Sequence, residues 1–183
     1  MKRNLAVFFF LLTAAASMYA HAHGKHVHGR HVHGEAEMNV VLQDSELLIE
    51  IQSPLANLTG FEHRPLNRQQ AAAVENMKAV MKDADRVFGL TPDALCAVRS
   101  VTLESAVFDE KSISDKGAGK EDGHNSLSAQ YLFACENPAR LRSMAVHLFA
   151  LFDGMHVIKV QAVSKGRQKA AALDAQRPTF SFE

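Results

Sequence analysis

Two runs of alternating apolar and polar residues stand close together near the start of the chain. The first covers residues 36–42 and the second residues 47–51, and the polar segment Gln43-Asp44-Ser45 separates them. Because successive side chains of a β-strand point to opposite faces, each run places its apolar side chains on one face. Two such runs joined by a short polar segment predict a β-hairpin with one buried face.

One amphipathic helix is expected after this hairpin. Apolar residues recur near helical spacing over residues 68–85, and Asn67 is of the residue type that caps helix N-termini. We interpret the segment 87–89 (VFG) as the turn that ends the helical segment.

Further β-strands are expected in the second half of the chain, with turns at Asn137-Pro138 and Asp153-Gly154. The expected strands cover residues 96–108, 126–135, 141–149 and 155–163, and an alanine-rich stretch (168–175) and a last segment (178–182) complete the chain. These elements predict an α+β fold: a mostly antiparallel β-sheet with one main amphipathic helix and a flexible histidine-rich N-terminal arm.

Residues 109–125 differ in composition from the segments around them. They are rich in Asp, Glu, Lys, Ser and Gly and hold almost no apolar residues. Such a segment cannot bury itself in a core, so we expect a mobile acidic loop.

The N-terminus has the pattern of a secretory signal peptide. Lys2 and Arg3 supply the positive charge, residues 5–12 form an apolar run, and small residues follow. We expect the leader to cover residues 1–22, with cleavage at one of residues 17–22. The apolar run is too short to cross a bilayer and later apolar stretches are interrupted by charges, so no membrane span is expected in the mature protein.

Histidines dominate the segment that follows. Six of the ten histidines lie within thirteen residues, in three near-identical five-residue units. These six are His21, His23, His26, His28, His31 and His33. Neutral imidazole is a common ligand of Zn²⁺, Cu²⁺ and Ni²⁺, and in an extended segment the two histidines of each His-x-His pair point to the same side. The intervening glycines let the chain fold back.

We therefore predict a metal-binding arm over residues 23–34. The alternative is a disordered tail or a purification tag whose histidines bind nothing specific. Zinc is the expected ion, and Cu²⁺ or Ni²⁺ are the alternatives because imidazole ligands alone do not determine metal selectivity.

Length and charge limit the other possibilities. Removing residues 1–22 from 183 leaves 161 residues, an ordinary size for the single α+β domain that we expect over residues 35–183. Lys2 and Arg3 leave with the leader, so 18 basic and 20 acidic residues remain and the net charge is −2. A basic patch with interleaved aromatics is absent, so nucleic acid is not an expected partner. No known catalytic motif stands in the sequence, which favours a non-enzyme.

The chain has two cysteines, Cys96 and Cys135. In an exported protein an even pair is typical of a disulfide, and coordination of a metal by thiolates is the alternative. The two residues flank the loop at 109–125, so we expect the disulfide to hold the two ends of this loop near each other.

Several motifs resemble those of the ZrgA-type periplasmic zinc-binding proteins. The histidine-rich arm continues into HGEAEMNV at residues 33–40, SPLANLTGFEH follows at residues 53–63, and one cysteine lies on each side of the acidic loop. The resemblance covers the mature chain. It implies a periplasmic protein that binds zinc and works with an ABC zinc importer or a second zinc receptor. Many relatives carry a long His/Asp tract between the cysteines, whereas this loop keeps a single histidine, His124.

Three residues outside the arm are further candidate metal ligands: Glu62, His63 and His124. Glu62 and His63 follow the apolar Phe61, and the resemblance supports both. The alternative for His63 is a hydrogen bond to a loop carbonyl that helps to seat the helix. His124 lies beside Asp122 and would complete a site from the loop; its alternative is a solvated side chain.

The sequence thus predicts a periplasmic protein that captures Zn²⁺ with its arm and holds the ion, or hands it on, at a site on the folded domain. A periplasmic buffer or resistance protein for copper or nickel is one alternative. The other is an envelope interaction domain without metal, in which the histidines form a pH-sensitive tether.

Overall fold

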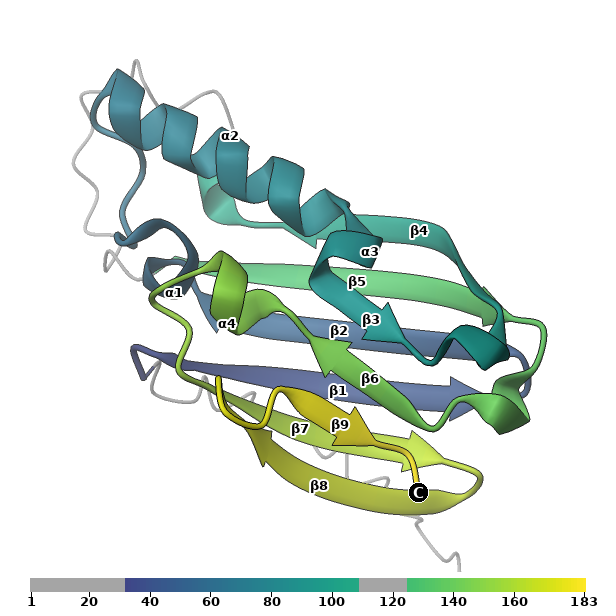
Figure 1. The fold of residues 1–183 in the computed structure, drawn as a ribbon. Coiled ribbons are helices and arrows are strands. Elements are labelled where there is room, and N and C mark those ends of the chain that lie inside the picture. Colours follow the sequence, from purple (N-terminus) through teal and green to yellow (C-terminus); the bar gives the residue numbers. More distant parts are fainter. Residues whose placement is uncertain (1–31, 109–124) are drawn as a thin grey trace, which may run out of the picture.

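The computed structural model describes residues 32–108 and 125–183. Within them, six strands form a large sheet in the order β4-β5-β2-β1-β7-β8 (Figure 1). Its strands are β1 (Glu35–Gln43), β2 (Glu46–Pro54), β4 (Cys96–Glu104), β5 (Ser126–Cys135), β7 (Val157–Ser164) and β8 (Arg167–Leu173). Neighbouring strands are antiparallel, except that β1 and β7 run parallel.

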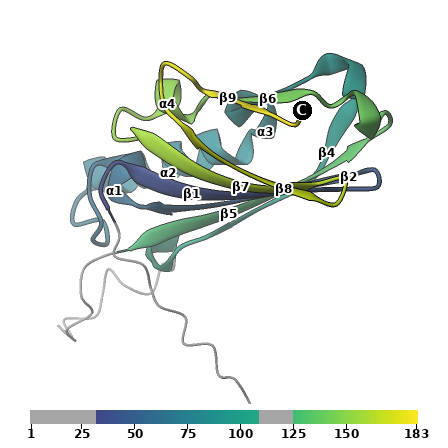
Figure 2. The same cartoon turned by 90° about the horizontal axis from the view of Figure 1, so that it is seen from below.

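A second layer covers one face of the large sheet (Figures 1 and 2). It contains a three-stranded sheet in the order β3-β6-β9 and the helices. The strands are β3 (Phe88–Leu90), β6 (Ser143–Val146) and β9 (Thr179–Ser181), and the helices are α1 (Ala56–Thr59), α2 (Arg68–Lys82), α3 (Ala84–Val87) and α4 (Leu148–Leu151). Short 3₁₀ segments are η1 (Pro92–Ala94), η2 (Ala106–Phe108) and η4 (Pro138–Arg140).

The hydrophobic core lies between the two layers and forms one cluster of buried side chains. Tyr131 of β5 links the two layers, because its hydroxyl donates a hydrogen bond of 2.7 Å to the carbonyl of Met81 near the end of α2. Burial raises the pKa of the Tyr131 phenol. The ring of Phe88 packs edge-on against Tyr131, with 5.0 Å between the ring centroids. The core thus joins the helical layer directly to the large sheet.

The predicted fold class is confirmed, as are the first hairpin and the main helix. In the hairpin, Gln43 pairs with Glu46, so the turn has two residues, and Asp44 adopts a φ of 52°. The helix begins after Asn67, whose side chain accepts a hydrogen bond from the backbone N–H of Gln70. It ends at Lys82 rather than near residue 85, because the chain there begins a separate turn of helix, α3.

Two predicted segments were wrong. Residues 87–89 were expected to form a turn, but Phe88–Leu90 is strand β3 and pairs with β6. A strand of three residues is too short to show an alternating pattern. Residues 141–149 were expected to form one strand, but β6 ends at Val146 and the helix α4 follows. A short apolar run does not distinguish a strand from a turn of helix.

The predicted disulfide between Cys96 and Cys135 is present, but its predicted role was wrong. The two cysteines lie opposite each other at the start of β4 and the end of β5. The loop leaves from the other end of this hairpin, about 30 Å away at the usual rise of a strand. Pairing of β4 with β5 holds the ends of the loop together, and the disulfide fastens the opposite end of the hairpin.

The predicted leader (1–22), the arm up to residue 31, and residues 109–124 of the predicted loop lie outside the described residues. None of the helices in the part of the chain that the structure describes is long and apolar enough to cross a membrane.

We predict that replacing both cysteines by alanine lowers the free energy of unfolding by about 4 kcal/mol, because the unfolded chain gains the entropy of an open loop. The disulfide closes a loop of sequence separation 39. Urea unfolding of the oxidised protein and of the double variant measures the difference. A change below about 1 kcal/mol would contradict the stabilising role.

Candidate metal centre

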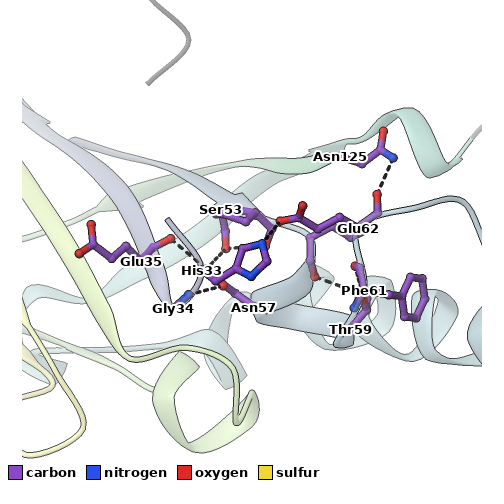
Figure 3. A network of polar contacts seen from close by, with 11 residues as sticks. His33, Gly34, Glu35, Ser53, Asn57, Thr59, Phe61, Glu62 and Asn125 are labelled. Atoms are coloured by element: carbon purple, nitrogen blue, oxygen red, sulfur yellow. Dashed lines mark hydrogen bonds and ion pairs between the residues drawn. The ribbon is translucent and has the colours of Figure 1, made fainter. Parts of the chain in front are cut away.

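The buried amide of Asn57 organises one end of the large sheet. Asn57 lies in α1, directly after β2, and is 3% exposed. Its Oδ1 accepts a hydrogen bond of 2.7 Å from the backbone N–H of Gly34, and its Nδ2 donates to the carbonyl of Glu35 at 2.9 Å and to Oγ of Ser53 at 3.1 Å (Figure 3). One side chain therefore fixes the start of β1 against the end of β2.

Gly34 is held on its other side by the start of β7. Its carbonyl accepts hydrogen bonds of 2.9 Å from the backbone N–H groups of both His156 and Val157. Its φ is +84°, a value that side chains disfavour, and a Cβ at this position would lie 2.6 Å from Cδ2 of His156. Glycine is thus required here by backbone conformation and by the neighbouring imidazole.

This arrangement places His33 over the loop that follows α1. Gly60 ends α1 in the left-handed conformation, with a φ of 85°, and directs the chain into Glu62. Nε2 of His33 lies 3.0 Å from Oε1 of Glu62 (Figure 3). His33 is 66% exposed, whereas Glu62 is 8% exposed. The last histidine of the arm therefore contacts a buried carboxylate of the folded domain.

The backbone of Glu62 is itself fixed. Its carbonyl accepts hydrogen bonds from the backbone N–H of Asn125 at 3.1 Å and from the Asn125 side-chain amide at 2.6 Å. The carbonyl of Asn125 in turn accepts from the backbone N–H of Leu55 at 2.9 Å. Asn125, the last residue of the predicted acidic loop, therefore lies directly beside Glu62.

His63 forms a hydrogen bond to a loop carbonyl, the alternative role that the sequence allowed for it. Its Nδ1 lies 2.8 Å from the carbonyl oxygen of Arg64, and its half-buried ring stacks on Phe61 with 5.1 Å between the ring centroids. A backbone carbonyl at Nδ1 fixes the orientation of an imidazole, and second-shell partners of this kind support metal coordination through Nε2. The geometry of His63 is thus compatible with both roles.

The nitrogen and oxygen donors of this region suit a metal ion of intermediate softness such as Zn²⁺. Imidazole nitrogen and carboxylate oxygen are both ligands of Zn²⁺, which takes four ligands in most structural sites. Among the described residues, however, no three His, Cys, Asp or Glu side chains are close enough to share one ion. The described part of the chain therefore provides a contact pair, His33 and Glu62, and not a complete coordination shell.

The predicted site residues divide into three groups. His33 and Glu62 are brought together, and His63 follows Glu62 with its ring turned onto Phe61. The cysteines form their disulfide at the other end of the β4–β5 hairpin. The remaining predicted ligands lie outside the described residues: His21, His23, His26, His28, His31 and His124.

Sequence reasoning missed the role of Asn57. Asn57 carries no signal of its own, because an Asn after a strand and a Pro is typical of an exposed loop. Only the resemblance of residues 53–63 to a family motif marked Asn57 as part of a functional segment.

Comparison with protein-family models gives a match over most of the chain. Residues 30–182 match the family model described as ZrgA family zinc uptake protein. No curated protein matches the chain. The resemblance inferred from the motifs is confirmed, and the match begins within the histidine-rich arm.

We predict that Asn57→Ala lowers the free energy of unfolding by about 2 to 4 kcal/mol, because it leaves the Gly34 N–H and the Glu35 carbonyl without their partner. Asn76→Ala is the matched control, since Asn76 is exposed on α2 and its loss should change stability by less than about 0.5 kcal/mol. Urea unfolding of the three proteins measures both values. Equal stability of the two variants would show that the Asn57 network is dispensable.

Proposed function

Because the chain belongs to the ZrgA family of zinc uptake proteins, we propose that it binds Zn²⁺ in the periplasm and supplies it to a zinc importer. In this proposal the histidine-rich arm captures the ion, and the end of the large sheet around His33 and Glu62 receives it. The protein acts by binding and transfer rather than by catalysis.

The contact between His33 and Glu62 is the observation that supports this proposal most strongly. It joins the last histidine of the repeat to a carboxylate in the second family-like motif, residues 53–63, at 3.0 Å. Glu62 is almost fully buried, and a buried carboxylate is favourable only beside a positive charge or hydrogen-bond donors. An imidazole supplies such a partner in the metal-free protein, and Zn²⁺ supplies a stronger one when it binds between them.

Transfer along the arm follows from the exchange of ligands. The three His-x-His units offer nitrogens in closely spaced pairs, so an ion is able to move from one pair to the next without being released to water. His33 belongs to the last of these pairs and is held by Gly34 and Asn57, so the fixed end of the arm is also the end nearest the domain. Ions captured by the arm would thus reach the buried carboxylate of Glu62.

The periplasmic location rests on the leader pattern and on the disulfide. Residues 1–22 have the charge and apolar run of a signal peptide. The Cys96–Cys135 disulfide is expected in an oxidising compartment. The mature chain of 161 residues is smaller than a receptor with two domains and a cleft, so we propose that it passes zinc to an ABC importer or to a second receptor.

We predict that Glu62→Gln weakens zinc binding at the domain by about 10-fold or more, because it replaces a charged oxygen ligand with a neutral amide. The test uses the mature protein with the arm histidines before residue 33 replaced by alanine, so that their sites do not mask the effect. Competition with a zinc chelator measures the affinity, and Cu²⁺ and Ni²⁺ titrations compare the ions.

Glu75→Gln is the matched control, because Glu75 lies exposed on α2 and pairs with Lys78 of the same helix. It should leave zinc affinity unchanged. If Glu62→Gln binds zinc as tightly as the parent protein, the domain site is elsewhere. If removal of the arm histidines abolishes all binding, the arm is the whole site and the domain serves only to find the partner.

A further inference from the structure

Two edge strands, β8 and β9, lie side by side at one side of the molecule (Figure 1). Within the described residues, β8 ends the large sheet and pairs with β7, and β9 ends the small sheet and pairs with β6. An edge strand carries backbone N–H and C=O groups that no neighbouring strand satisfies. Another chain can therefore add to it as a further strand.

The turn before β8 determines which of its backbone groups are free. Its two residues, Lys165 and Gly166, have φ values of 51° and 71°, and positive φ at both positions is typical of a type I′ hairpin turn. The flanking residues Ser164 and Arg167 therefore form a hydrogen-bonded pair. Antiparallel strands alternate between hydrogen-bonded and non-hydrogen-bonded pairs. The backbone groups that point away from β7 are thus those of Gln168, Ala170 and Ala172.

The two edges of the large sheet differ in regularity. The register of β4 with β5 shifts between Val98 and Ser100, which marks a β-bulge. The register of β8 with β7 continues without a shift from Arg167 to Leu173. Bulges are one of the features by which proteins keep an edge from pairing with another chain. The β8 edge, unlike the β4 edge, is therefore regular enough to receive a strand.

A hollow of about 160 Å³ lies between β8 and β9. Its apolar lining comes from Ala162, Phe180 and Phe182. The ammonium of Lys169 lies 5.7 Å from the centroid of the Phe180 ring, so apolar and cationic groups adjoin here. Pockets for small-molecule ligands usually measure about 300 to 1,000 Å³. The hollow is thus of a size for one side chain of a bound segment rather than for a separate ligand.

The β8 edge is basic although the mature chain carries a net charge of −2. Arg167 and Lys169 line the hollow, and Lys165 lies in the turn before them. Glu183 also lines the hollow, but its carboxylate lies 3.9 Å from the guanidinium of Arg142. In the ranges 32–108 and 125–183, no acidic side chain pairs with Lys165 or Arg167. The charge of this edge is therefore complementary to an acidic partner.

We infer that β8 and the adjoining hollow form a docking site for an extended acidic segment of a partner protein. The segment adds as a strand beside β8, its carboxylates face Arg167 and Lys169, and one apolar side chain enters the hollow. In binding of this kind the main-chain hydrogen bonds supply affinity, and the side-chain pocket supplies specificity. The site uses none of the candidate metal ligands, so this inference goes beyond the proposed zinc function.

Protection of the edge is the competing explanation for the same cations. Charged side chains on an edge strand keep two copies of a protein from pairing with each other. In that case the parent protein binds no acidic peptide, and Arg167→Ala makes the chain self-associate. A docking site predicts instead that the parent binds the peptide and that Arg167→Ala stays monomeric in sedimentation.

The experiment uses the mature, metal-free protein and a fluorescein-labelled peptide in which glutamate alternates with valine around one central leucine. Fluorescence anisotropy measures its binding, and a peptide with lysine in place of glutamate is the control ligand. We expect the parent to bind the glutamate peptide and not the lysine peptide. Arg167→Glu should weaken binding about 10-fold or more, because it places like charges opposite each other. Arg99→Glu, on the exposed β4 edge, is the matched control and should leave binding unchanged.

A second variant tests the strand pairing itself. Ala170→Pro removes a backbone N–H that points away from β7, so it should abolish binding of the glutamate peptide while urea unfolding shows that the domain still folds. The inference is overturned if the parent does not prefer the glutamate peptide. It is also overturned if Arg167→Glu binds the peptide as tightly as Arg99→Glu does.

Discussion

The hydrogen bonds of the Asn57 side chain are the interaction on which the candidate site depends. One buried amide binds the backbone of Gly34 and Glu35 at the start of β1 and the hydroxyl of Ser53 near the end of β2. A Cβ on Gly154 would lie 2.8 Å from the Asn57 carbonyl oxygen, so the loop before β7 also packs closely on α1. The start of β1, the end of β2 and the loop before β7 therefore meet at Asn57.

The two ends of the large sheet therefore have different roles. The disulfide and the hairpin turn lie at one end and stabilise the pairing of strands. The other end carries the candidate metal ligands, held by polar side chains, glycines and a short helix rather than by a covalent bond. The backbone of this site is thus fixed, while the His33 side chain stays exposed.

Local patterns predicted much of the fold. Alternation over residues 36–51 predicted the hairpin, and helical spacing with an Asn N-cap predicted α2, because both signals lie within one segment. The parallel pairing of β1 with β7, the second sheet and the position of the disulfide depend on contacts between remote segments, which no local pattern encodes. The same reason applies to the site: His33 and Glu62 were predicted as ligands from their motifs, whereas the role of Asn57 follows only from the folded chain.

Anomalous diffraction at the zinc edge, from crystals of the mature protein with one equivalent of zinc, tests the central claim most directly. The account predicts one strong peak within coordination distance of the His33 imidazole and the Glu62 carboxylate, about 2.0 to 2.2 Å from the ligand atoms. A peak at the other end of the sheet, or at another surface histidine with none at Glu62, would contradict it.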